Sequence, residues 1–164
     1  MHDAYADTLV YNLDEGDPDF LDDHVLSLPY RIANRRPRVL VIGVGGGSDV
    51  LTAMRYNANH VTGVELDPVT FDLIRDHLSE INRGGGFKRR EIELVAAEGR
   101  HYVKKSRDRF DVIQITGVDT LAATNSGAYV FAENYLHTVE AFHEYLDHLE
   151  PKGILFSANL LTLE

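Results

Sequence analysis

The chain has 164 residues, of which 44% are hydrophobic and 26% charged, a balance typical of one globular domain with a buried core. Its formal net charge of −10 argues against binding nucleic acid, because a phosphate backbone requires a basic surface. Cysteine is absent, which excludes disulfides, thiolate metal sites and a cysteine nucleophile.

The sequence shows no segment that targets or anchors it. No apolar run approaches the roughly 18 residues of a membrane-spanning helix, and the first residues lack the pattern of a secretion signal. We therefore expect no insertion of this chain into a membrane and a cytoplasmic location, either as a whole protein or as the soluble domain of a larger one.

Residues 1–37 differ in composition from the rest and are predicted to form an N-terminal segment of acidic loop and short helix. The run 14–19 (DEGDPD) is acidic and rich in turn formers, so it predicts a surface loop. A short helix is expected between Asp19 and Asn34, with Pro29 breaking or kinking it. The remaining residues, 38–164, form the predicted main domain.

Short apolar runs alternate with helical patterns from residue 38 onward. A continuous apolar run such as 39–44 is typical of a strand buried on both faces. The alternation indicates an α/β fold, a doubly wound, Rossmann-like parallel sheet with helices on both faces. The predicted strands are 39–44, 61–65, 92–96, 111–116 and 154–160.

Two helices are predicted from the spacing of their apolar residues. The first begins at Asp67-Pro68, where an aspartate cap precedes a proline in the first turn. The second ends at the run 151–153 (PKG). The residues expected on the buried faces are Phe71, Ile74, Leu78 and Ile81 in the first helix, and Leu136, Val139, Phe142, Leu146 and Leu149 in the second.

A turn dense in glycine follows the first strand and brings a ligand close to the backbone. A phosphate loop needs Lys followed by Ser or Thr after its last glycine, but Ser48 and Asp49 stand here, and Asp49 would repel phosphate. A dinucleotide fingerprint needs glycine where Ser48 stands, which weakens nicotinamide binding without excluding it. The glycines of this turn are Gly43, Gly45, Gly46 and Gly47.

Two acids end the second and third strands at the same edge of the predicted sheet. Glu65 lies about 20 residues after the glycines, where a carboxylate accepts the two hydroxyls of a ribose. Glu98 would reach the rim of the same crevice and accept an adenine amino group. The pattern predicts a nucleoside site, with Glu65 facing solvent until ligand binds; the alternative is that both acids are plain surface residues.

Four motifs in this order resemble those of spermidine synthases and, more broadly, the S-adenosylmethionine-dependent methyltransferase fold. They are GVGGG at 43–47, VELDP at 64–68, AEGR at 97–100 and FDVIQITGVD at 110–119. The stretch 126–138 also resembles spermidine-synthase-like domains fused to bacterial membrane segments. The resemblance covers about residues 38–160 and implies strand order 3-2-1-4-5, with the last strands of the complete fold missing.

The resemblance also implies the ligand and the site residues. The ligand is S-adenosylmethionine or its decarboxylated form, with methylthioadenosine as product analogue, and polyamine biosynthesis is the implied role. Asp49, Asp119 and Tyr129 are then expected near the acceptor substrate. The nucleoside contacts are Gly43, Gly45, Gly46, Gly47, Glu65, Leu66, Glu98, Gly99 and Thr116.

The catalytic motif departs from that of spermidine synthases, which carry D-S-S-D-P after the fourth strand. Here Thr116 replaces the first aspartate and only the second remains, as Asp119. The aspartate of the family's glycine motif is also missing, since Gly46 stands in its place. In that family the first aspartate of D-S-S-D-P helps to deprotonate the attacking amine, and the second binds the amine substrate. Because a threonine hydroxyl cannot accept a proton at neutral pH as a carboxylate can, aminopropyl transfer to putrescine is disfavoured. Methyl transfer to an unknown acceptor, or nucleoside binding without chemistry, are the alternatives.

Histidines cluster near the last predicted helix without the spacing of a metal site. His137, His143 and His148 share this region with Glu144 and Asp147. His143 and Asp147 are four residues apart, but no two of the histidines are. We interpret them as a solvated helix face and expect no bound metal.

The last predicted strand, 154–160, is apolar and nothing after it in this chain pairs with it. An uncovered strand edge promotes association, and residues 1–38 lead into the first strand, some distance away. We therefore expect a homodimer or other self-association, or further chain beyond residue 164.

Overall fold

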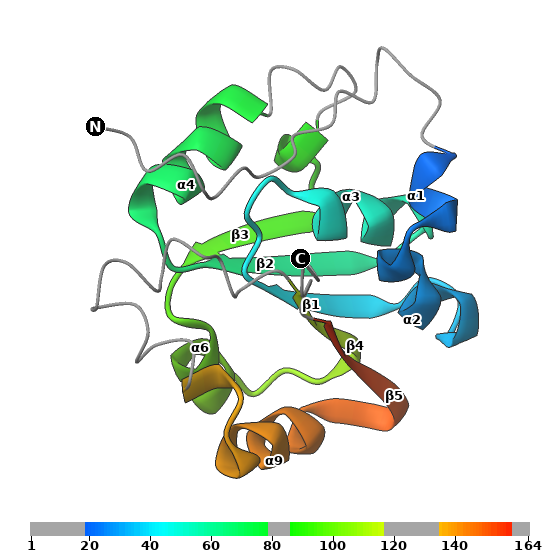
Figure 1. Ribbon diagram of the computed structural model, residues 1–164, viewed down its shortest axis with the longest axis vertical. Helices are drawn as coiled ribbons and strands as arrows, with labels where there is room; N and C mark the ends of the chain where they lie inside the picture. Colours follow the sequence, from blue (N-terminus) through cyan, green and yellow to red (C-terminus); the bar gives the residue numbers. More distant parts are fainter. Residues whose placement is uncertain (1–18, 79–85, 117–134, 159–164) are drawn as a thin grey trace, which may run out of the picture.

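The computed structural model describes residues 19–78, 86–116 and 135–158 of the chain. A single sheet runs through the centre, and its strands follow the order β3-β2-β1-β4-β5 (Figure 1). Every pair of neighbouring strands is parallel. The predicted α/β class and strand order are therefore confirmed. The strands are β1 (Arg38–Ile42), β2 (His60–Glu65), β3 (Ile92–Ala96), β4 (Phe110–Thr116) and β5 (Leu149–Ala158).

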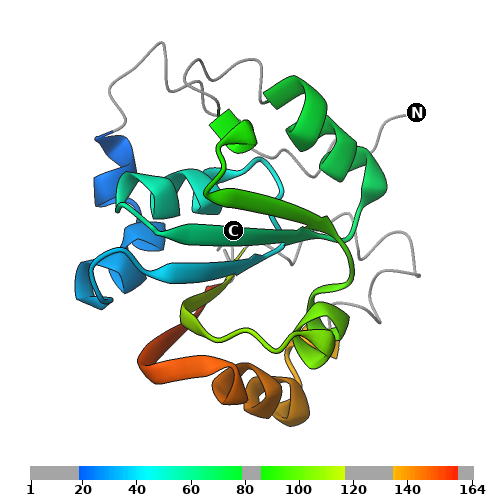
Figure 2. The same ribbon diagram turned by 180° about the vertical axis from the view of Figure 1, so that it is seen from behind.

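Helices cover both faces of the sheet, as Figures 1 and 2 show from opposite sides. On one face lie α1 (Phe20–Asp23), a 3-10 turn (Val25–Ser27), α2 (Leu28–Ile32), α3 (Ser48–Arg55) and α4 (Pro68–Asp72). On the other face lie α6 (Gly99–Lys105) and α9 (Val139–Asp147). A π-helical turn (Leu73–Leu78) continues α4, and a 3-10 turn, η3 (Gly86–Lys88), precedes β3.

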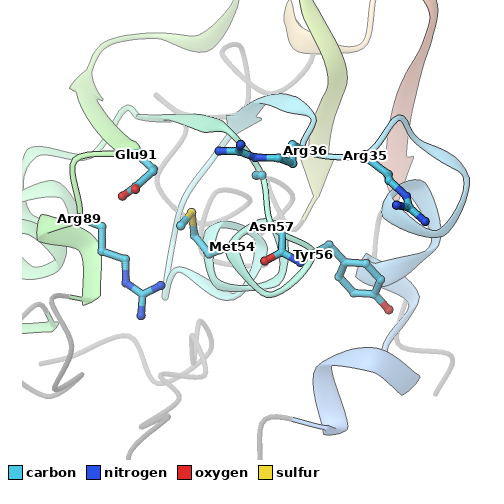
Figure 3. A pocket seen from close by; sticks show the side chains of 8 residues that line it. Arg35, Arg36, Met54, Tyr56, Asn57, Arg89 and Glu91 are labelled. Carbon is cyan, nitrogen blue, oxygen red and sulfur yellow. The ribbon is translucent and has the colours of Figure 1, made fainter.

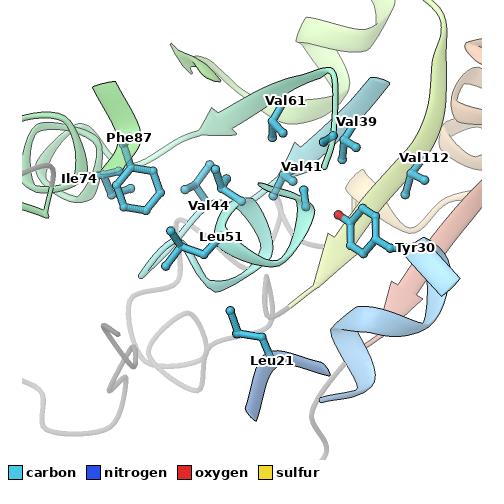
Figure 4. Close-up of a cluster of buried hydrophobic side chains, with 13 residues drawn as sticks. Leu21, Tyr30, Val39, Val41, Val44, Leu51, Val61, Ile74, Phe87 and Val112 are labelled. Carbon is cyan, nitrogen blue, oxygen red and sulfur yellow. The ribbon is translucent and has the colours of Figure 1, made fainter. Parts of the chain in front are cut away.

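Alternate residues of β1 enter two separate cores. Val39 and Val41 pack with Tyr30 of α2 on the α3 face, in the cluster drawn in Figure 4. Leu40 and Ile42 belong to the opposite core. These four residues are at most 2% exposed, so the continuous apolar run marks a strand buried on both faces, as expected.

The segment before β1 packs onto the sheet. Instead of one helix between Asp19 and Asn34, it forms α1, the 3-10 turn and α2. Pro29 lies in the first turn of α2, where its missing N–H breaks no helical hydrogen bond. Leu21 and Tyr30 are buried, and α2 contacts β5. The expectation that this segment lies away from the fifth strand is therefore wrong.

The predicted helix 136–149 is shorter than expected. Thr138 caps α9 by accepting from the Ala141 amide, and the helix ends at Asp147, so Leu149 already belongs to β5. The expected buried face is wrong in part, since Val139 is 70% and Leu146 53% exposed. The buried side chains are Ala141 and Tyr145, because the large Tyr145 ring fills the core.

The helix expected from 68 to 81 begins as predicted, because the Asp67 side chain accepts from the Val69 and Thr70 amides. Ile74 is fully buried, as expected of its place on the inner face. The wider π-helical turn replaces a regular α-helix after Asp72, and Ile81 lies outside the described residues.

Candidate functional site

The glycine turn joins β1 to α3 at the carboxyl edge of the sheet. Gly43, Gly45 and Gly47 have φ angles of 83°, 50° and 88°, a region that residues with a Cβ rarely adopt. A Cβ on Gly47 would also lie 2.1 Å from Cζ of the buried Phe87 ring. Packing against Phe87 therefore requires a glycine at position 47, in addition to its backbone angle. Sequence reasoning assigned no role to Phe87, which packs over this turn from η3.

Glu65 is the last residue of β2, and its carboxylate bridges the glycine turn and the turn that leads into α4. Its Oε2 accepts from the Gly45 amide at 3.0 Å, and its Oε1 accepts from the Asp67 amide at 2.9 Å. The residue is only 8% exposed. The expectation of a solvent-facing Glu65 is wrong, because the backbone amides of two turns draw its carboxylate inward.

Glu98 follows β3 and caps α6. Its two carboxylate oxygens accept from the Arg100 amide at 2.9 Å and from the His101 amide at 2.7 Å. The next residue, Gly99, sits close to β1, since a Cβ there would lie 2.3 Å from Cγ2 of Ile42. Both residues thus have structural tasks that motif reasoning did not reveal.

A buried polar cluster lies under the glycine turn and contains Asp49, Tyr30, Gln114 and Thr116. Asp49 stands in the first turn of α3 and is 6% exposed. One of its carboxylate oxygens accepts from Nε2 of Gln114, and the other accepts from Oγ1 of Thr116 at 2.7 Å. The Tyr30 hydroxyl donates to Oε1 of Gln114 at 2.6 Å.

Burial raises the pKa of Asp49 to about 6, although the hydrogen bonds from Thr116 and Gln114 favour its charged form. Burial, and then the charge on Asp49, raise the pKa of Tyr30 well above its ordinary value, so Tyr30 remains a neutral donor. Sequence reasoning singled out Asp49 and Thr116 separately but missed Gln114 and Tyr30. The signal that was available is the alternation of Gln114 and Thr116, which places both on the α3 face of β4.

The carboxyl edge thus brings together the glycine turn, Asp49, Glu65, Glu98 and Thr116. Leu66 follows Glu65 and is 45% exposed. Two candidate substrate residues, Asp119 and Tyr129, lie outside the described residues.

The opposite, amino edge of the sheet holds a separate pocket of about 810 Å³ (Figure 3). It opens between the segments that lead into β1, β2 and β3. Its lining residues are Arg35, Arg36, Met54, Tyr56, Asn57, Ala58, Arg89 and Glu91. None of the predicted site residues lines it, so it is distinct from the carboxyl-edge site.

Two further properties concern the described part of the chain. Within residues 19–78, 86–116 and 135–158, no three metal-ligating side chains are grouped to hold an ion. In the same ranges, no helix has the length and apolar character needed to cross a membrane.

Most of the chain is similar to known proteins. The profile of the spermine/spermidine synthase domain matches residues 21–160. Polyamine aminopropyltransferase 2 of Hyperthermus butylicus is 32% identical over 139 residues, which cover 81% of this chain and 43% of that protein. The chain thus spans less than half the length of this curated relative.

Solved structures share the fold at lower identity. A spermidine synthase in complex with the transition-state analogue AdoDATO has a TM-score of 0.64 at 24% identity, covering 85% of this chain and 43% of that one. A SAM-dependent methyltransferase from Geobacter sulfurreducens, in complex with S-adenosyl-L-homocysteine, has a TM-score of 0.57 at 18% identity, covering 85% and 47%.

Proposed function

Because the chain belongs to the spermine/spermidine synthase domain family, we propose that the carboxyl edge of its sheet binds an S-adenosyl-type nucleoside for aminopropyl transfer. The donor would be decarboxylated S-adenosylmethionine, with methylthioadenosine as the product. The observation that carries this proposal is the position of Glu65, held between the glycine turn and the turn into α4 at the end of β2.

The carboxylate of Glu65 has acceptor capacity left for a ribose. An ionised carboxylate offers about four acceptor positions, and the Gly45 and Asp67 amides use two of them. The two hydroxyls of a ribose would take the others. Because both amides fix the side chain before ligand arrives, little rotamer entropy is lost on binding.

The adenine would lie between the ends of β2 and β3. Glu98 has acceptor positions left after capping α6, and one of them would receive the adenine amino group. The exposed Leu66 offers an apolar surface for a face of the ring.

The first turn of α3 argues against a phosphate at this place. Helix N-termini usually attract anions through their free amides and the helix dipole. Here the carboxylate of Asp49 already lies in that turn and is buried beneath the glycine turn. A second anion would meet this carboxylate, which favours a nucleoside without phosphate over a dinucleotide such as NAD.

Methyl transfer is the second candidate, and Thr116 is the observation that favours it. Some methyl acceptors are already deprotonated and need no base, so they do not need the aspartate that Thr116 replaces, and orientation then supplies much of the rate. In either reaction, an amine acceptor would enter beside Thr116, and we propose Asp119 and Tyr129 as its contacts.

Isothermal titration calorimetry with methylthioadenosine, S-adenosylmethionine, its decarboxylated form and NAD tests the proposal. We expect saturable binding of the three adenosyl sulfur compounds and none of NAD. At about 100 times its dissociation constant, a bound nucleoside raises the free energy of unfolding by about 2.7 kcal/mol. Folded protein that binds none of the three adenosyl compounds would refute the proposal.

A further inference from the structure

Gln114 and Thr116 of β4 both donate hydrogen bonds to the carboxylate of Asp49 in α3. Gln114 and Thr116 point to the same face of β4, because side chains two apart on a strand share a face. On that face they meet Asp49 of α3, which is 6% exposed, while Gln114 is fully buried and Thr116 7% exposed. The acid is therefore present at this edge, but it comes from the helix rather than the strand.

The direction of each hydrogen bond in the cluster is fixed by Asp49, because an ionised carboxylate can only accept. The amide nitrogen of Gln114 therefore faces Asp49 and donates to it, and Oε1 of Gln114 accepts from the Tyr30 hydroxyl. The second carboxylate oxygen of Asp49 then accepts from the Thr116 hydroxyl at 2.7 Å. The proton of Thr116 is thus directed inward, which leaves its oxygen as an acceptor at the end of β4.

The charge of this cluster supports a proton acceptor. Burial raises the pKa of Asp49 to about 6, so the group is mostly ionised at neutral pH yet takes up a proton readily. The titratable group that faces it from α2 is Tyr30, which remains a neutral donor because its pKa is raised. Glu65 lies across the glycine turn, bound to the amides of Gly45 and Asp67.

We propose that Thr116 accepts a proton from an amine substrate, and that Asp49 is a positioning residue that acts through Thr116 and takes up the proton of its hydroxyl. This rests on the proposed aminopropyl transfer. In that reaction the nitrogen of an uncharged amine bonds to the carbon beside the sulfonium sulfur, and the electron pair of the broken carbon–sulfur bond stays on sulfur. The surplus N–H proton passes to Oγ1 of Thr116 while the hydroxyl's own proton passes to Asp49. The sulfonium charge and the Asp49 charge both vanish, so the step balances.

This arrangement gives Thr116 a capacity that it lacks alone. A free threonine hydroxyl is too weak a base to accept a proton at neutral pH. With an ionised carboxylate behind it, the hydroxyl passes the proton on within one short hydrogen bond. The chain then still has a base although position 116 is a threonine: the base is Asp49, which lies behind Thr116.

The first test measures the pair without catalysis. Carbon-13 NMR of the aspartate carboxyls, with the Asp49 signal assigned through Asp49→Asn, gives the Asp49 pKa from pH 4 to 8. Thr116→Val should raise that pKa, because it removes a hydrogen bond to the charged form, and Thr116→Ser should restore it. An unchanged Asp49 pKa in Thr116→Val would overturn the proposal.

The second test measures aminopropyl transfer to 1,4-diaminobutane against pH. We expect a rate that falls as the pH drops through the Asp49 pKa, because protonated Asp49 accepts no further proton. Thr116→Val and Asp49→Asn should each lower kcat by about 100-fold and abolish this inflection, and Asp49→Asn should leave KM for the nucleoside unchanged. Thr116→Ser should retain most of the rate.

The matched control is Asp111→Asn, the same change at the other end of β4, where Asp111 accepts from Asn34 and from the Arg38 amide. Its rate and inflection should equal those of the wild type. If Asp49→Asn fails to fold, the near-isosteric Thr116→Val decides. A wild-type rate in Thr116→Val overturns the relay, as does a chain that binds nucleoside but transfers to no amine. Failure of nucleoside binding in calorimetry instead refutes the proposed function, and the relay with it.

Discussion

Glu65 combines a structural task with its proposed ligand contact. Glu65→Ala would leave the Gly45 and Asp67 amides without their acceptor, so we expect a loss of about 1–3 kcal/mol in the free energy of unfolding. Urea denaturation measures this loss. A solvent-facing acid would have little effect on stability, but Glu65 is only 8% exposed.

The control for this prediction is Glu93→Ala on neighbouring β3. Glu93 has a side chain that is 58% exposed and pairs with His60 at 3.4 Å. Its removal should change stability by less than about 0.5 kcal/mol. Equal effects of the two substitutions would contradict the bridging role of Glu65.

Asp49 makes stability depend on pH in an unusual direction. Its pKa is raised from 3.8 to about 6 in the folded state, so the folded chain binds this proton more tightly than the unfolded chain does. Stability from Asp49 is therefore present below about pH 4 and lost as pH rises through about 6, by about 3 kcal/mol.

Denaturation of the wild type and Asp49→Asn at several values between pH 4 and 7 tests this. The difference in unfolding free energy between the two should change with pH in the stated sense, whatever constant offset the substitution adds. Parallel pH curves for the two proteins would show that Asp49 titrates normally.

At the scale of elements, Arg100 joins α6 to α9. Its Nε and Nη2 donate to the two carboxylate oxygens of Glu144 at 2.7 and 2.9 Å, and its guanidinium lies 4.0 Å from the centre of the Tyr135 ring. The Arg100 side chain is 6% exposed. Arg100→Lys loses the paired geometry, so we expect thermal denaturation to show a loss of about 1–3 kcal/mol.

An exposed arginine provides the comparison. Arg75 contacts Asp72 and Asp76, but its side chain is 50% exposed. Arg75→Lys should cost less than about 0.5 kcal/mol, because surface ion pairs contribute little. A loss at Arg100 no larger than that at Arg75 would argue against a clamp between the two helices.

The strands of the sheet were predictable because their signal is local. The run from Val39 onward is apolar on both faces, and parallel strands buried on both sides require that pattern. The face of α9 was not predictable in the same way. Leu146 fits a helical spacing as well as Tyr145 does, and only the packing of the opposite core selects Tyr145.

The candidate site divides similarly. The order of the glycine turn, Glu65 and Glu98 follows from sequence motifs, because parallel strands bring their carboxyl ends to one edge. The hydrogen bonds of Asp49 with Gln114 and Thr116 join residues 65 and 67 positions apart, and no local sequence pattern indicates such contacts. The same holds for the contact of Tyr30 with Gln114.

At the scale of the whole molecule, β5 is the last strand of the sheet in the described ranges. Most of its residues are half-buried or exposed, and α2 covers part of it. Because an open edge offers unpaired amides to another chain, we predict self-association that grows with concentration in multi-angle light scattering.

A charge on this edge should prevent that association. Ser157 is an exposed residue of β5, and Ser157→Lys adds a positive charge without removing core volume. We expect this variant to be monomeric, while His143→Lys on the exposed face of α9 associates like the wild type. A monomeric wild type would show that the edge is already protected.

The reach of Tyr30 from α2 into the polar cluster has a thermodynamic consequence. The hydroxyl that anchors α2 also orients Gln114, and Gln114 in turn holds Asp49. The packing of α2 onto the sheet and the binding of a ligand at the carboxyl edge are therefore linked by a coupling free energy. By reciprocity, a ligand that engages Thr116 and favours this arrangement tightens the hold of α2 on the sheet, and loosening α2 weakens that ligand by the same factor.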